Sequence, residues 1–556
     1  MIGATPPSDP RRDDADKASP AGPRTRGGQP RSVLLLLSFV YLVFYARTAT
    51  FDYVWDDSVN SPESELLRGP LAQVIRRGEH ARVDPAMERM PKDIVPKHES
   101  YRPVSATSHW LDVHLFHNRP GLFHLHNVVL GLLSIVLVWR LSRALALGPW
   151  LTCLWALHPL HVEVFAYISA RSDLLAAIFS LSALLAALRS AEASDARTRW
   201  TFAAVASLAQ LLSLFSKEAN IALPLAVIAL AVARGRLRAS LVSVMAMLAA
   251  TAAYFPIRRA LMLATSLPMA QKQAVVRAFA DLPGLALAYA TSFVLPISLS
   301  PDRQLWPGFV PLGRAAAAVL LGGLVLTMRR ARPESLIHLK LAASALAAYG
   351  VLLLPAALGL RSIGALADRY VFFPLFFLAL SFLALARSLK PALANLPAVL
   401  RVGPLVAWGV LLLATSWLQI GAWRNEETLA RHAVAMDPDN AAALYRLATV
   451  ETTRGSFRAA LPLLERAVTL DPSNQKALGN LSVTYLNLDR VADAKAVLRR
   501  LLPMAGATDR KFWYNVASVQ LADGKADKAC AALQHALEID PGYALALSLR
   551  NQVCGH

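Results

Sequence analysis

Apolar segments of membrane-spanning length recur along the first three-quarters of this chain, between Ser32 and Ile420. About 17 to 25 apolar residues are enough for one transmembrane helix. The chain is 55% hydrophobic and only 17% charged over its 556 residues, which is more apolar than a soluble core needs. We therefore predict an all-α protein with a helical membrane domain of about eleven spans over residues 32–420.

The expected spans are separated by short polar turns, and some are short enough to be broken or tilted. They lie at 33–45, Leu122–Val138, Leu145–Leu157, Leu174–Leu188, Thr201–Phe215, Ile221–Ala233, Leu241–Ile257, Ala315–Met328, Ile337–Ala357, Val371–Ala386 and Ala398–Ile420. A further apolar segment, Leu282–Leu299, is interrupted by Pro283, Gly284 and Pro296. We expect this segment to be interfacial or re-entrant, because irregular backbone at membrane depth needs protein cover.

Basic clusters between the spans predict the orientation, since cytoplasmic loops are enriched in Lys and Arg. The clusters are Arg140/Arg143, Arg197/Arg199, Arg234/Arg236/Arg238, Arg329/Arg330/Arg332 and Arg387/Lys390. Eleven crossings then put the polar loop 46–121 and the C-terminus together on the outer side. We expect the chain to be a multi-pass protein of the bacterial inner membrane, with both parts in the periplasm.

The remaining composition limits the other classes of function. Residues 1–31 are rich in Pro, Gly, Arg and Asp, which predicts a disordered basic leader in the cytoplasm. The net charge of +19 is spread in short clusters between spans, so we expect no nucleic-acid partner. Cys153, Cys530 and Cys554 have no paired spacing typical of a zinc site or a disulfide framework.

The C-terminal segment 421–556 contains an internal repeat of about 34 residues. Three copies, at 441–474, 475–508 and 510–543, carry small or apolar residues at matching positions, and a half repeat at 428–438 precedes them. Asp489 stands in the middle copy where the others have Gly455 and Gly524, so its second helix is expected to be longer or less regular. The pattern predicts a short tetratricopeptide (TPR) superhelix, capped by residues 544–553.

An acidic pair, Asp56-Asp57, follows the first span in the sequence Trp55-Asp56-Asp57-Ser58. Neighbouring side chains point in different directions, so we expect different roles for the two. One carboxylate can act as general base toward an acceptor hydroxyl, and the other can orient it. Taken alone, the pair also fits a solvated cap of an interfacial helix.

Further polar motifs fall at the outer ends of the spans, where ionisable groups are costly and often functional. They are Tyr101-Arg102-Pro103, His158-Pro159-Leu160-His161-Val162-Glu163, Arg171-Ser172-Asp173, Ser216-Lys217-Glu218 and Asp368-Arg369-Tyr370. His158 and His161 do not have the i, i+4 spacing of a helical zinc pair, so no metal site is expected.

The order of these motifs, followed by TPRs, resembles the transmembrane and TPR-containing O-mannosyltransferases of the glycosyltransferase C superfamily. The resemblance covers nearly all of the chain after the leader. It implies a polyprenyl- or dolichyl-phosphate sugar donor, an acidic base in the first outer loop, and inversion at the anomeric carbon. The donor is then a co-substrate, and no cofactor is expected.

Residue by residue, the expected site has three groups. Asp56 is the expected base, with Asp57 assisting it. The donor phosphate is expected to bind Arg369, Arg102, Arg171 and Lys217, because Arg offers a planar fork to phosphate oxygens. Supporting positions around these groups are expected at His158, His161, Glu163, Glu218, Asp368, Tyr370 and Tyr101.

The expected reaction moves a sugar, mannose or a related hexose, to a hydroxyl of a protein or glycan acceptor. The TPR groove is expected to recruit that acceptor or a protein partner. Two alternatives remain open: a TPR membrane scaffold without catalysis, and a polysaccharide ligase or polymerase that uses a lipid-diphosphate donor.

Overall fold

The computed structural model describes residues 31–77, 101–261, 269–297, 299–301, 303–305, 308–363, 366–394, 396–505 and 509–554. The expected leader at 1–31, apart from Arg31, and residues 78–100 of the outer loop lie outside the described residues. Across the described residues the chain is helical, and its only β pairing is a single bridge between Arg303 and Leu366. The all-α prediction is confirmed.

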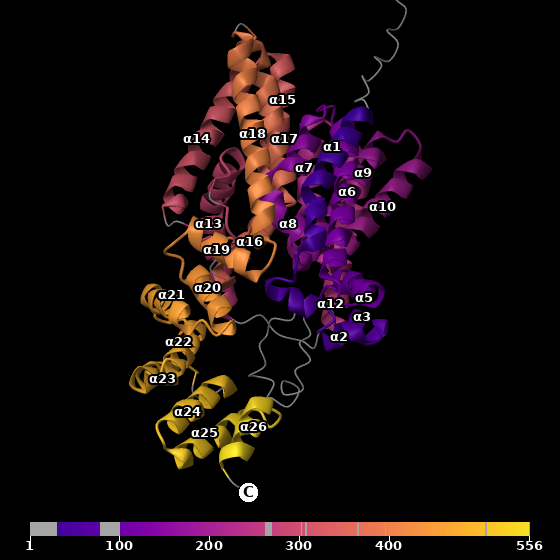
Figure 1. The fold of residues 1–556 in the computed structure, drawn as a ribbon. Coiled ribbons are helices and arrows are strands. Elements are labelled where there is room, and N and C mark those ends of the chain that lie inside the picture. Colours follow the sequence, from indigo (N-terminus) through magenta and orange to yellow (C-terminus); the bar gives the residue numbers. More distant parts are fainter. Residues whose placement is uncertain are drawn as a thin grey trace, which may run out of the picture.

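The membrane part is a bundle of long helices, drawn in Figure 1. It contains α1 (Arg31–Tyr45), α6 (Pro120–Ala144), α7 (Trp150–Leu157), α9 (Arg171–Glu192), α10 (Ala196–Ser216), α11 (Leu223–Ala233), α12 (Leu237–Leu261), α13 (Met269–Val294), α14 (Phe309–Arg330), α15 (Pro333–Leu352), α16 (Leu354–Ile363), α17 (Pro374–Leu393) and α18 (Ala398–Ala422).

Short helices occupy the turns at the polar end of this bundle. They are η1 (Ala46–Thr50), η2 (Trp55–Asn60), α2 (Glu65–Arg68), α3 (Leu71–Arg77), α5 (Pro103–Phe116), η3 (Pro159–His161), α8 (Val162–Ala166), η4 (Ile168–Ala170), η5 (Glu218–Asn220) and η6 (Asp368–Val371).

Eight helical segments within the described residues are long and apolar enough to cross a membrane, fewer than the eleven expected. The other three predicted spans correspond to α7, α10 and α11. At a rise of about 1.5 Å per residue, the eight residues of α7 are too short to cross alone. The chain continues from α7 directly into η3 and α8 at the polar end.

The direction of the first and last helices fixes the parity of the passes. α1 ends next to the polar loop, where the backbone N–H of Asp52 donates to the carbonyl of Arg424 at 3.0 Å. Arg424 follows the end of α18, so both helices arrive at the same end of the bundle. The chain therefore passes along the bundle an odd number of times, which is consistent with eleven passes.

The expected interruption at Pro283 is wrong, because α13 runs unbroken from Met269 to Val294 with this proline inside it. α13 and α14 approach closely here: a Cβ on Gly284 would lie 2.7 Å from the Cα of Val310. Small residues permit such close helix packing. α13 is not among the eight candidate spans, and neither are α7, α10 and α11, so the expectation that Leu282–Leu299 does not cross stays a prediction.

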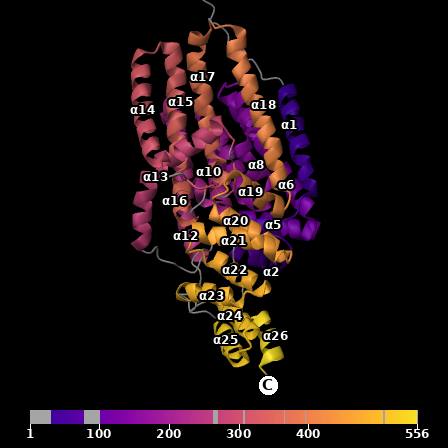
Figure 2. The same ribbon diagram turned by 60° about the vertical axis from the view of Figure 1, so that its left-hand side comes forward.

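The C-terminal helices form pairs that extend from one end of the bundle, as both ribbon views show (Figures 1 and 2). Gly455, Asp489 and Gly524 occupy the matching turns with φ of 76°, 58° and 73°. Asp489 therefore adopts the left-handed turn that glycine favours. The helices are α19 (Glu426–Met436), α20 (Ala441–Thr453), α21 (Phe457–Leu470), α22 (Gln475–Asn487), α23 (Val491–Ala505), α24 (Arg510–Ala522), α25 (Ala526–Ile539) and α26 (Ala544–Val553).

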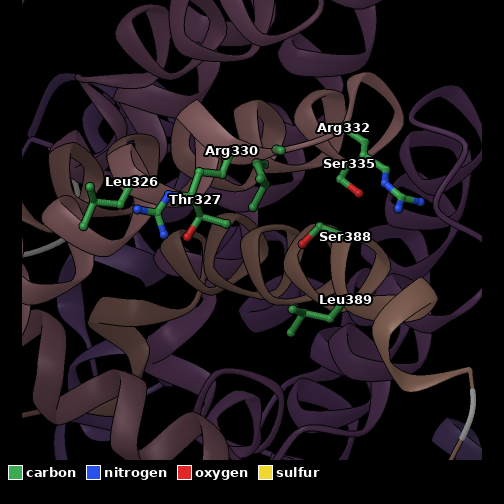
Figure 3. Close-up of a pocket in the computed structure, with 9 residues that line it drawn as sticks. Leu326, Thr327, Arg330, Arg332, Ser335, Ser388 and Leu389 are labelled. Carbon is green, nitrogen blue, oxygen red and sulfur yellow. The ribbon is translucent and has the colours of Figure 1, made fainter.

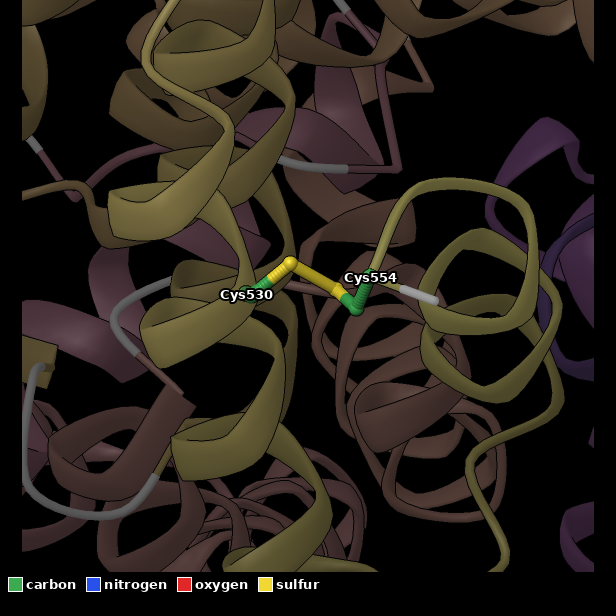
Figure 4. The surroundings of a disulfide bond; sticks show 2 residues. All are labelled: Cys530 and Cys554. Atoms are coloured by element: carbon green, nitrogen blue, oxygen red, sulfur yellow. A yellow bond between two sulfur atoms is a disulfide. The ribbon is translucent and has the colours of Figure 1, made fainter. Parts of the chain in front are cut away.

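A disulfide between Cys530 and Cys554 joins α25 to the residue after the capping helix α26 (Figure 4). The spacing of the cysteines had predicted no disulfide, and the bond between these two residues, 24 positions apart, shows that this prediction is wrong. Packing of α26 against α25 around the buried Ala546 brings the two Cα atoms to 5.7 Å, within the range of a disulfide. Cys153 is free.

Candidate functional site

The acidic loop contacts the first TPR directly. The backbone N–H of Trp55 donates to Glu426 Oε2 at 2.9 Å, and the Arg446 guanidinium lies 4.2 Å from the centroid of the Trp55 ring. In addition, His432 Nε2 of α19 lies 2.9 Å from the carbonyl of Leu299. The acidic loop and the TPR domain therefore meet at one end of the bundle.

Trp55 has a positive φ of 52°, which is rare for a bulky residue. Aromatic contacts hold it on two further sides, with ring centroids 5.7 Å from Tyr167 and 5.4 Å from Trp423. Such strained backbone persists only where the surroundings determine it, and it concentrates at functional sites. The strain lies immediately before the acidic pair.

Asp56 and Asp57 have different surroundings. Asp57 is fully buried, and its Oδ1 accepts from the Ser169 N–H at 2.9 Å and the Ser169 hydroxyl at 2.7 Å. Its Oδ2 accepts from the Val54 N–H at 3.1 Å. Asp56 is exposed, and its carboxylate has no hydrogen-bond or ion-pair partner among the described residues. Asp56 is thus the carboxylate that an incoming hydroxyl can reach, while Asp57 holds η2 against η4.

Burial raises the pKa of Asp57 from its ordinary value of 3.8 to about 7, and the neighbouring Asp56 charge adds to this rise. The hydrogen bonds from Ser169 and Val54 oppose it. Between these two values the folded protein keeps a proton that the unfolded chain has released. The stabilisation that this proton gives is therefore present at low pH and lost as the pH rises toward 7.

We expect Asp57→Asn to remove this pH dependence. Relative to the variant, the free energy of unfolding of the wild type should fall by up to about 1.4 kcal/mol per pH unit between about pH 4 and pH 7. Above pH 7 the difference should stay constant. Apparent melting temperatures of the two purified proteins across this range measure the effect. Parallel profiles for the wild type and the variant would show that Asp57 does not titrate in that window.

All four predicted phosphate-binding residues form ion pairs, and three of them, Lys217, Arg102 and Arg369, keep some exposure to solvent. Lys217 Nζ donates to both oxygens of Asp173 at 2.7 and 2.6 Å. Arg102 donates to both oxygens of Glu218 at 3.3 and 3.2 Å. Arg369 pairs with Glu163 and also donates its backbone N–H to that carboxylate at 3.2 Å.

Two of these cations, Lys217 and Arg369, lie beside the ring of Tyr370. Lys217 Nζ lies 5.4 Å and the Arg369 guanidinium 5.1 Å from the centroid of the Tyr370 ring. Burial lowers the pKa of Lys217; Asp173 opposes this, and the charges of Arg102 and Arg369 lower it further. The charges of Arg102 and Arg369 therefore lie near enough to Lys217 to affect its pKa.

Helix α8 links this basic region to the acidic loop. Glu163, at its start, holds Arg369. Four residues later, the hydroxyl of Tyr167 accepts the backbone N–H of Asp56 at 3.3 Å. Burial, Asp57 and Asp56 raise the pKa of Tyr167, and Arg369 opposes them. Tyr167 therefore lies between the acidic pair and the basic cluster.

Arg171 does not join the basic cluster. It is fully buried, and its Nε donates to Asn127 Oδ1 at 2.6 Å while Nη2 donates to the Phe123 carbonyl at 2.9 Å. Its Nη1 pairs with Asp112. These contacts use all three nitrogens, so the guanidinium is not available to a phosphate.

Several predicted supporting residues have structural partners instead. His158 Nε2 lies 2.9 Å from the Phe293 carbonyl, and His161 Nδ1 lies 2.7 Å from the Trp155 carbonyl. The Tyr101 hydroxyl donates to the Ile75 carbonyl at 3.0 Å. Within the described residues no three His, Cys, Asp or Glu side chains gather as a metal site.

Sequence reasoning missed Arg303, which pairs with Asp368 and donates to Ser292 Oγ at 2.8 Å. Its side chain is 16% exposed, so it is a further cation at the polar end. The only available signal was its place in the short polar stretch after Leu299. Ser169, Tyr167, Glu426 and Arg446 were also missed, because long-range contacts alone bring them to the site.

Family models of the tetratricopeptide repeat match residues 426–475, 451–513 and 511–543. The C-terminal part is a TPR domain. One solved structure, of a TPR protein called YrrB with an unusual peptide-binding site, is 20% identical and covers 31% of this chain and 87% of that chain, with a TM-score of 0.22.

Among curated proteins, the chain is similar to several named protein O-mannosyl-transferases. F38B6.6 of Caenorhabditis elegans is 26% identical over 32% of this chain and 26% of its own length. TMTC1 of Mus musculus is 36% identical over 17% of this chain and 10% of its own length. TMTC4 of Mus musculus is 29% identical over 27% of this chain and 22% of its own length. The chain spans about a quarter or less of the length of these relatives. The similarities support the resemblance to the TPR-containing O-mannosyltransferases.

Proposed function

We propose that this protein is a membrane glycosyltransferase that moves a hexose, mannose or a close relative, from a polyprenyl-phosphate donor to an acceptor hydroxyl. One observation carries the proposal: an exposed carboxylate, Asp56, lies on a strained loop against the first TPR and is linked through Tyr167 and α8 to Arg369. A base and a group of cations are what transfer from a lipid phosphate requires.

In the proposed reaction, Asp56 takes the proton of the acceptor hydroxyl as its oxygen attacks the anomeric carbon of the donor. The bond from that carbon to the phosphate oxygen breaks, and the lipid phosphate leaves with the electron pair. Attack opposite the leaving group inverts the anomeric carbon. Arg369 and Lys217 stabilise the departing charge, with Arg102 beside them. The scheme uses no metal or other cofactor.

We further propose that the TPR groove recruits a protein or glycan acceptor, since TPR superhelices offer a concave binding surface. The contact of Arg446 with Trp55 puts the start of this superhelix next to Asp56. An acceptor bound by the repeats would thus be delivered to the base.

The reacting side is proposed to be the periplasmic face of a bacterial inner membrane. Two observations support it. The disulfide of Cys530 and Cys554 lies in the TPR domain, and disulfides persist in oxidising compartments. Arg330 ends α14 and Arg332 immediately precedes α15, at the end of the bundle that faces away from the acidic loop. Basic residues in such a loop are typical of the cytoplasmic side.

A comparison of donors tests the proposal. Purified protein is incubated with a hydroxyl acceptor and mannose on polyprenyl monophosphate, on polyprenyl diphosphate, or on a nucleotide. We expect transfer from the monophosphate alone. Transfer from the diphosphate alone would favour a ligase or polymerase, and no transfer from any donor would favour a scaffold.

The contact between Trp55 and Arg446 gives a further prediction. Arg446→Ala should lower transfer to small acceptors by about 2- to 30-fold, as expected for the loss of a cation–π contact of 0.5 to 2 kcal/mol that holds the strained loop. Arg431→Ala is a matched control that removes the same charge from an exposed side chain of α19. Steady-state rates with a short acceptor measure the effect, and equal rates for both variants would mean that Arg446 does not position the loop.

A further inference from the structure

A groove of about 820 Å³ lies between α1, α6, α9 and α10, toward the ends of these helices that face away from the acidic loop. Its wall is apolar and runs along the helices, with Leu34, Leu35, Leu137, Leu185, Phe202 and Val205 as the main residues. An apolar wall of this kind fits an acyl chain.

Four arginines from three helices surround the groove: Arg31, Arg140, Arg143 and Arg189. All four are exposed, and none forms an ion pair with a carboxylate among the described residues. Arg143 lies 4.8 Å from the centroid of the Trp139 ring. The end of the apolar groove thus carries several positive charges that no acidic side chain in the described residues neutralises.

Trp139 supplies a second, independent observation. It lines the same groove and is 8% exposed, yet its buried indole N–H has no hydrogen-bond partner among the described residues. Buried donors are nearly always satisfied, so an oxygen atom from outside the chain is expected to accept from it.

We propose that this groove binds one anionic phospholipid of the leaflet opposite the acidic loop. The headgroup phosphate is held by the arginines, an oxygen of the lipid accepts from Trp139 Nε1, and one acyl chain lies along the apolar wall. Basic pockets between transmembrane helices on the cytoplasmic side bind such headgroups. The site is distinct from the proposed donor site and does not depend on the transferase proposal.

The structure offers a matched control at the same end of the bundle. A smaller pocket of about 350 Å³ lies between α14, α15 and α17, and its lining includes Arg330, Arg332, Ser335 and Ser388 (Figure 3). Replacing Arg330 and Arg332 removes the same charge from the same face, so it separates a general loss of basic charge from loss of the groove.

The test is native mass spectrometry of the purified full chain, titrated with phosphatidylglycerol or with phosphatidylcholine. We expect one tightly bound phosphatidylglycerol, about tenfold weaker binding in Arg140→Gln/Arg189→Gln, and unchanged binding in Arg330→Gln/Arg332→Gln. Trp139→Phe, which keeps the ring and loses the donor, should weaken binding several-fold.

Three results would overturn the proposal. Equal binding of the two lipids would mean that the groove takes acyl chains without regard to charge. Equal weakening in both double variants would assign the effect to general basic charge. Full displacement of the lipid by inorganic phosphate would mean that the acyl chain contributes nothing. If the double variant folds poorly, Trp139→Phe still decides, because unchanged phosphatidylglycerol binding in it would contradict the assigned contact.

Discussion

Asp56→Asn is expected to lower sugar transfer by about 10²- to 10⁴-fold, the usual contribution of a general base. The side chain is exposed and has no hydrogen-bond or ion-pair partner among the described residues, so its replacement should leave expression and melting temperature unchanged. The amide is nearly the same size as the carboxylate but cannot take the proton of the acceptor. Rates of transfer from a polyprenyl-phosphate donor measure the loss.

Asp52→Asn is the matched control, because Asp52 is an exposed carboxylate of the same loop whose backbone, not its side chain, contacts Arg424. It should keep near wild-type activity. Full activity in Asp56→Asn together with an inactive Asp57→Asn would move the base by one position. Full activity in both would remove the acidic pair from the mechanism.

Arg369→Ala is expected to cost about 2 to 4 kcal/mol of transition-state stabilisation, as when one charge-stabilising donor is lost. Arg369→Lys should rescue only part of this, since Lys lacks the bidentate fork. Kinetic constants for the donor measure the effect as the change in kcat/KM.

The alanine variant also leaves Glu163 buried without its cation, which is destabilising in itself. Arg369→Ala/Glu163→Gln removes that unpaired charge and separates folding from chemistry. If the double variant regains both stability and normal donor kinetics, Arg369 serves the fold and does not bind phosphate.

Local patterns in the sequence predicted the architecture well. The recurrence of apolar segments and the 34-residue repeat depend on neighbours within one helix or one repeat, so each can be recognised from the sequence alone. The same holds for Asp489, whose place in the repeat indicated a turn before the structure gave its positive φ.

Features that depend on partners far along the chain were less predictable. Pro283 suggested a break, but the packing of α13 on α14 keeps the helix continuous. Arg171 and Arg369 look equivalent in sequence, and only their contacts separate the buried Arg171 from the partly exposed Arg369. The disulfide required the docking of α26, which no spacing rule supplied.

Mass spectrometry of a hydroxyl-bearing acceptor, after incubation with polyprenyl-phosphate mannose and purified protein, shows directly whether the protein transfers a hexose. We expect one added hexose per acceptor with wild type and with Asp52→Asn but not with Asp56→Asn. An unmodified acceptor in the wild-type reaction, or equal modification by Asp56→Asn, would contradict this expectation.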